Sequence, residues 1–262
     1  MDVYFARRTR EEKEEKLTRR GTSTRYAREC TLTLGKKVMT TSKPKHEWRK
    51  HEKEIYCPKR KPALIRVPRY KFITIRGEGN PNKEPFNERI RALYPIAYGI
   101  KMTAKKPDMA PSGHYDFTVY PLEGVWDIND KAKRNFTGIV DKDDLVYEIM
   151  LRQPDFVTES YFQQILDIAK GKNPNPLFDE VEFVEAEEGL CLQMLHVGPF
   201  DTEAESFKIM EEFASDQGLS RESKLHREIY LSDFRKTAPE KLKTVLRFKI
   251  KTAQQGGAGQ RR

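Results

Sequence analysis

One order of strand and helix patterns occurs twice along this chain, and that repetition limits the folds it can adopt. The first copy, over about residues 60–155, runs through ALIRVPRYKFITIRGEG (strand), NPNKEPFNERIRALYPIAYGIKM (helix), HYDFTVYPL (strand) and DLVYEIMLRQ (strand). The second, over about residues 175–250, runs through FDEVEFVEAEEGLCLQMLHVG, DTEAESFKIMEEFASDQG, LHREIYLSD and LKTVLRFKI in the same order. A helical pattern, DFVTESYFQQILDIAKGK, links the two copies.

The copies lie about 115 residues apart, whereas solenoid repeats recur every ~20–50 residues. We therefore predict an α+β fold of two strand–helix–strand–strand modules related by a pseudo-twofold axis. Two such modules facing each other leave a ligand cleft between them, which is a favoured place for small-molecule sites. The copies also align weakly by residue, with Tyr230 on Tyr120 and Arg247 on Arg152.

Positive charge is concentrated at the two ends of the chain. Of the 49 Lys and Arg residues, 12 lie in residues 1–44 and 3 in residues 251–262, which leaves 34 in the interior against 34 Asp and Glu. We therefore predict a basic, poorly ordered extension over 1–44, one domain over 45–250 and a disordered tail over 251–262. Nucleic-acid binding requires basic residues gathered on a folded face, so it is not favoured.

The sequence lacks the patterns that are typical of membrane-spanning, secreted, metal-binding and nucleotide-binding proteins. No apolar stretch approaches the roughly 18 residues of a membrane span, and the charged N-terminus is not a secretory signal, which favours the cytoplasm. Three scattered cysteines and five scattered histidines form no metal-binding pattern. Phosphate loops, dinucleotide fingerprints and nucleophile elbows are absent, so we expect neither a cofactor nor a metal.

The segment His226–Ser232 is the strongest candidate for a chemical site. Alternation along a strand places His226, Glu228 and Tyr230 on one face and Ile229 on the other. A carboxylate between His and Tyr in a partly desolvated cleft suits general-base catalysis, because burial raises its pKa. An ordinary solvated face of an edge strand is the alternative that the pattern leaves open.

Aromatic residues of the first copy complete the candidate site. The expected strand HYDFTVYPL places Thr118 where the second copy has Glu228, so we predict an asymmetric site with one carboxylate. Glu123 and Trp126 follow that strand. Together with Tyr98, Tyr120 and Tyr230, they form candidate walls for a flat ligand, with core packing as the alternative for each aromatic residue.

Seven segments together resemble the GyrI-like small-molecule-binding family, which is named after the DNA gyrase inhibitor protein. They are KHEWRKHEKEIYCPKRKPALIRVP, IRGEGNPN, LYPIAYGIKM, DFTVYPLEGVWDI, YEIMLRQPDFV, LQMLHVGPFDTEAESF and HREIYLSDFRKTAPEKLKTVLR. The resemblance covers about residues 45–250. It implies the GyrI-like/SOUL-type fold, with paired strand–helix–strand–strand modules and a ligand cleft between them.

The resemblance also implies a function. The chain looks like stand-alone family members that hydrolyse cyclopropane-bearing DNA-alkylating toxins with a pocket glutamate, whose counterpart is Glu228. The expected partner is a small aromatic or amphipathic ligand, and the sequence leaves monomer and homodimer open. The alternative is a protein that binds a drug or toxin, or inhibits a partner such as gyrase, without turnover. A regulator's ligand domain would need a DNA-binding module, for which residues 1–44 are too short and too poor in apolar side chains.

Overall fold

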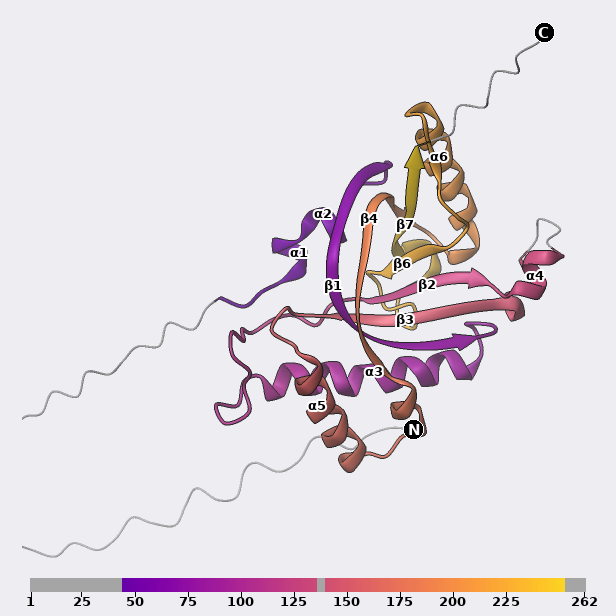
Figure 1. Cartoon of the computed structure of the whole chain (residues 1–262). Coiled ribbons are helices and arrows are strands. Elements are labelled where there is room, and N and C mark those ends of the chain that lie inside the picture. The colour runs from indigo at the N-terminus through magenta and orange to yellow at the C-terminus, as the bar shows by residue number, and fades with distance from the viewer. Residues whose placement is uncertain (1–43, 136–139, 253–262) are drawn as a thin grey trace, which may run out of the picture. The chain divides into compact units, whose positions relative to one another are not determined.

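The computed structural model describes residues 44–135 and 140–252 (Figure 1). Its strands are β1 (Ala63–Glu78), β2 (Leu122–Ile128), β3 (Leu145–Gln153), β4 (Glu182–Val197), β5 (Leu219–Arg221), β6 (His226–Tyr230) and β7 (Lys243–Thr252). Its α-helices are α1 (Trp48–His51), α2 (Lys53–Tyr56), α3 (Glu84–Thr103), α4 (Asp130–Arg134), α5 (Glu159–Lys172) and α6 (Glu203–Asp216). Single 3-10 turns occupy Lys142–Asp144, Pro176–Glu180, Phe200–Thr202 and Pro239–Lys241.

Six strands close into a barrel. Hydrogen-bonded neighbours follow in the order β4, β1, β3, β2, β6 and β7, and β7 pairs with β4 to close the ring. Every pairing between these strands is antiparallel, and β5 extends the sheet beside the end of β7. Closure leaves no unpaired edge within the ring, and such edges are sites of unwanted strand addition.

The two halves have the same topology. The first half joins β1, β3 and β2 in that order, and the second joins β4, β7 and β6. Corresponding strands pair with each other across the halves, β1 with β4 and β2 with β6. These pairings are antiparallel, as a twofold relation requires. The predicted α+β class and the duplicated strand–helix–strand–strand modules are therefore confirmed, and α5 is the predicted linking helix.

Helices cover the outside of the barrel (Figure 1). Helix α3 begins with Pro85 in its first turn, where no donor is lost, and buries Phe86, Ile90, Leu93 and Ile100 at helical spacing against β1 and β3. Helix α6 buries Met210 and Ala214 against a separate apolar cluster on β4 and β7. This cluster consists of Leu192, Met194, Leu246, Phe248 and Ile250. Each fully buried leucine, isoleucine, phenylalanine or methionine side chain contributes roughly 1.5–3 kcal/mol to the free energy of folding.

The inside of the barrel is polar, because alternation along the strands turns charged residues inward. Arg227 on β6 pairs in register with Arg247 on β7, and both are buried. Glu188 contacts both guanidinium groups, at 2.9 Å from Arg227 Nε and 2.8 Å from Arg247 Nη1. The Arg227 Nη1 also lies 2.7 Å from Glu123 Oε2. Buried charges require such partners, so the interior is an ion-pair network.

The N-terminal segment before β1 is tied to the same interior. Glu52 forms a short ion pair with the buried Arg152 of β3, and the Ile55 carbonyl accepts a 2.9 Å hydrogen bond from Arg247 Nη2. Trp48 is 4% exposed, and its indole nitrogen donates to the Val119 carbonyl at 3.0 Å. These contacts fix α1 beside the start of β2.

One predicted strand is wrong. Residues 114–121 form no strand, and only Phe117 makes an isolated bridge, which is parallel and joins it to His46. The strand begins at Leu122, directly after Pro121, which has no N–H to donate to a ladder. In the described residues no helix is long and apolar enough to cross a membrane. The predicted disorder of residues 1–43 and 253–262 concerns segments outside the described residues.

Candidate active site

The site is built on the outer faces of β2 and β6, which pair at the boundary between the two halves. The ladder sets Gly124 opposite Glu228 and Trp126 opposite His226. Directly paired residues share a face of the sheet, so Trp126, His226, Glu228 and Tyr230 lie together. The sequence analysis predicted this grouping for the three residues of β6. Glu228 is only 8% exposed, so the alternative of an ordinary solvated face is wrong.

Two hydrogen bonds join these side chains in pairs. Trp126 Nε1 donates to the Tyr230 hydroxyl over 2.8 Å, and His226 Nε2 lies 3.2 Å from Glu228 Oε1. The Tyr230 side chain also lies close to Glu228. Burial, and then the Glu228 carboxylate, raise the pKa of Tyr230 well above its ordinary value. The hydroxyl therefore keeps its proton at neutral pH.

A second carboxyl group lies beside Glu228. Glu203, in the first turn of α6, is 6% exposed and lies against Glu228. Burial, and then the charge of Glu228, hold the pKa of Glu203 well above its usual range. Two adjacent buried carboxylates cannot both ionise at low cost, so the raised pKa favours the protonated form of Glu203. The prediction of a single carboxylate was wrong.

Gly124 makes room for this arrangement. A Cβ at this position would lie 2.7 Å from Trp126 Nε1 and 3.1 Å from the Tyr230 hydroxyl. The indole and the phenol meet directly above the glycine, so a side chain there would separate them. The sequence analysis missed Gly124 because it placed the strand at residues 114–122, whereas β2 spans Leu122–Ile128.

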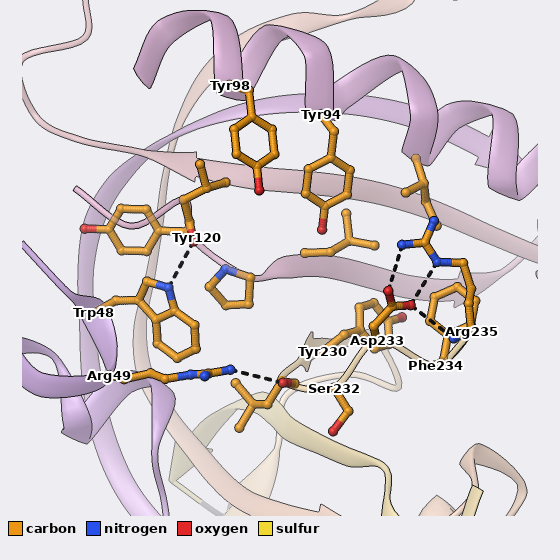
Figure 2. A pocket seen from close by; sticks show the side chains of 15 residues that line it. Trp48, Arg49, Tyr94, Tyr98, Tyr120, Tyr230, Ser232, Asp233, Phe234 and Arg235 are labelled. Carbon is orange, nitrogen blue, oxygen red and sulfur yellow. Dashed lines mark hydrogen bonds and ion pairs between the residues drawn. The ribbon is translucent and has the colours of Figure 1, made fainter. Parts of the chain in front are cut away.

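A cavity of about 210 Å³ lies between α1, α3 and the loop after β6, and Tyr230 forms part of its wall (Figure 2). Tyr230 and Leu122, which pair in register, form part of its lining, and Tyr94 and Tyr98 descend from α3 on the other side. Ile90 of α3 also lines it, and the remaining lining residues come from α1, from the stretch before β2 and from the loop after β6: Trp48, Arg49, Val119, Tyr120, Pro121, Leu231, Ser232, Asp233, Phe234 and Arg235. Glu228 does not line the cavity, whereas Tyr230, two positions along β6 on the same face, does.

Aromatic side chains dominate the walls of this cavity. Tyr94 and Tyr98 stack with ring centroids 6.2 Å apart, and Phe200 stands edge-on to both Tyr230 and Phe234. Tyr98 is 52% exposed, so the alternative of core packing is wrong for this residue, and it lines the cavity. Such walls suit a flat apolar ligand.

Two residues predicted for the ligand site, Glu123 and Tyr120, form ion pairs or hydrogen bonds with other side chains of the protein. Glu123 is 2% exposed and faces the barrel interior, where its carboxylate pairs with Arg227 and accepts a 3.3 Å hydrogen bond from Tyr56. It does not share a face with Trp126, because the two lie an odd number of positions apart. Tyr120 lines the cavity but is 2% exposed, and its hydroxyl donates to Glu52 over 2.7 Å.

Residues that the sequence analysis missed include Glu203 and the α1 pair Trp48 and Arg49. An acidic residue in a first helical turn is ordinary, because it complements the helix dipole, so Glu203 carried no distinguishing signal. In the described residues no group of His, Cys, Asp and Glu is arranged to hold a metal ion.

The comparisons with known proteins agree with this geometry. The family model of the GyrI-like small molecule binding domain matches residues 60–251. This chain belongs to the GyrI-like family. A Listeria innocua protein described as a hydrolase is 39% identical, with a TM-score of 0.71, and the match covers 79% of this chain and 100% of that one. A second Listeria innocua structure, of an uncharacterized conserved protein, is 40% identical with the same TM-score and coverage. No curated protein matches this GyrI-like chain.

Proposed function

We propose that this GyrI-like protein hydrolyses electrophilic small molecules, in particular flat, cyclopropane-bearing compounds that alkylate DNA. The observation that carries the proposal is the buried pair of Glu203 and Glu228 close to Tyr230, whose side chain lines an aromatic cavity. Two carboxyl groups side by side, one with a raised pKa, can serve as an acid and a base, with Glu203 as the acid and Glu228 as the base. The similarity to a Listeria innocua protein described as a hydrolase supports the same activity class.

The proposed reaction adds one water to the strained ring. Aromatic walls, including Tyr98 and Tyr230, hold the flat ligand, and Glu228 accepts a proton from the attacking water. A C–O bond forms as a cyclopropane C–C bond breaks, and the released electron pair moves to a conjugated carbonyl oxygen. That oxygen takes up a proton from Glu203, while Tyr230 or His226, which lie close to Glu228, stabilise the developing negative charge. General-base assistance is typically worth about 10²–10⁴-fold, and relief of ring strain adds driving force.

Binding without turnover is the second candidate, and one observation favours it. Glu228 is 8% exposed and does not line the cavity, so a ligand in the cavity does not contact the carboxylate directly. In that case the protein sequesters a drug or toxin, or acts on a partner in the manner of a gyrase inhibitor. The carboxylate then serves as a counter-charge.

The fate of the ligand separates these candidates. A cyclopropane-bearing alkylator is incubated with the wild type and with Glu228→Gln, and the products are weighed by mass spectrometry. Catalytic addition of one water by the wild type alone supports the hydrolase. Recovery of intact ligand from both proteins, after demonstrated binding, rejects turnover and leaves the sequestering protein.

We also propose that the protein acts in the cytoplasm, where it would protect DNA from such compounds and so confer drug resistance. Within the described residues Cys57 and Cys191 are free thiols, in keeping with a reducing compartment.

A further inference from the structure

The cavity has one wall whose chemistry the proposed reaction does not use. Trp48 and Arg49 of α1 lie side by side along this wall (Figure 2). The guanidinium carbon of Arg49 lies 4.7 Å from the centroid of the Trp48 ring, in a cation–π contact. Because the Trp48 indole is held by the Val119 carbonyl at 3.0 Å, it offers Arg49 a fixed platform.

Arg49 carries the only unneutralised charge of the cavity lining. The other charged lining residues, Asp233 and Arg235, neutralise each other through two hydrogen bonds of 2.8 and 2.9 Å. Among the described residues, Arg49 forms no ion pair and makes one long hydrogen bond, 3.4 Å from Nη2 to the Leu231 carbonyl. Most of its five N–H donors therefore remain available.

We infer that Arg49 selects ligands that carry a carboxylate or another negatively charged oxygen at one end of a flat aromatic body. The guanidinium matches such an oxygen in charge and in geometry, and hydrogen bonds between two charged groups are about twice as strong as neutral ones. Trp48, Tyr94 and Tyr98 contact the apolar body. This inference rests on the proposed function, because it describes the ligand of the same cavity.

Three probes with one aromatic body test the inference. They are 2-naphthoate (anion), 2-naphthylmethanol (neutral) and 2-naphthylmethyl-trimethylammonium (cation), titrated by calorimetry into the wild type, Arg49→Gln and Lys50→Gln. The control Lys50→Gln removes the same charge from the next residue of α1, which lies outside the cavity lining. We expect the wild type and Lys50→Gln to bind naphthoate at least about fivefold more tightly than the alcohol, with the cation weakest, and Arg49→Gln to lose that preference.

Two results overturn the inference, and they are distinguishable. Equal affinities for the three probes, or a naphthoate preference that survives in Arg49→Gln, reject Arg49 as the selecting group while the aromatic cavity stands as a ligand site. Failure of every probe to bind the wild type rejects the cavity itself, and the proposed function with it.

Discussion

At the scale of single residues, the site depends on the absence of a side chain at Gly124. We predict that Gly124→Ala separates Trp126 from Tyr230 and lowers the free energy of unfolding by about 1–3 kcal/mol, because the new methyl group overpacks the contact. Tryptophan fluorescence and denaturant unfolding measure the two effects.

The matched control for this prediction is Gly171→Ala near the end of α5, where an added Cβ meets nothing within 4 Å. It should leave the fluorescence unchanged and raise the stability slightly, because alanine favours a helix more than glycine does. Equal effects of the two substitutions would contradict the role given to Gly124.

The raised pKa of Glu203 predicts how the stability of the protein depends on pH. A carboxyl group whose pKa is raised in the fold binds its proton more tightly in the folded than in the unfolded protein. Its contribution is therefore most favourable below its ordinary value of 4.5 and is lost as the pH rises toward the folded-state pKa. Glu203→Gln removes this dependence, so its melting temperature relative to the wild type should increase with pH above about 4.5.

Thermal melts from pH 4 to pH 9 test this difference. The control is Glu205→Gln, an exposed position in the same turn of α6. If the difference in melting temperature between Glu203→Gln and the wild type stays constant over that range, the assignment of a bound proton to Glu203 is wrong.

At the scale of elements, the ion pairs inside the barrel hold β6 so that Glu228 faces outward. Arg227 is buried between Glu123 and Glu188, and its neighbour Glu228 consequently points to the opposite face. We predict that Glu123→Gln lowers the free energy of unfolding by about 3 kcal/mol, because it removes one partner of a buried charge. Urea denaturation measures the change.

Glu187→Gln is the control for this element, since it removes a carboxylate from an exposed ion pair with Arg69. Such surface pairs contribute less than about 1 kcal/mol. A loss of similar size for both variants would show that the interior network does not fix β6.

The elements also show where sequence reasoning succeeds. Periodicity identified α3, α5 and α6, and alternation placed His226, Glu228 and Tyr230 on one face of β6. It failed at residues 114–121, where a run of β-branched and aromatic residues packs without a ladder. Pairing partners that lie far apart in the chain decide whether such a run becomes a strand, and local propensity does not contain them.

At the scale of the whole molecule, duplication predicted the two modules and the cleft between them. It did not predict that the barrel closes through β4 and β7, nor that its interior is charged. Glu203 and Arg49 reach the site from α6 and α1, so only the folded chain brings them beside the residues of β6. The sequence thus predicted the candidate site residues of β6 together with Trp126 and Tyr98, and missed those that α1 and α6 contribute.

Turnover in isotopically labelled water tests the central claim most directly. The wild type, Glu228→Gln and the control Glu205→Gln are each incubated with excess cyclopropane-bearing alkylator in H₂¹⁸O, and labelled product per protein is counted by mass spectrometry. Our account predicts many labelled products per wild-type and control molecule, and a loss of about 10²–10⁴-fold in Glu228→Gln with ligand binding retained. Equal turnover by Glu228→Gln, or no labelled product from the wild type despite binding, would contradict it.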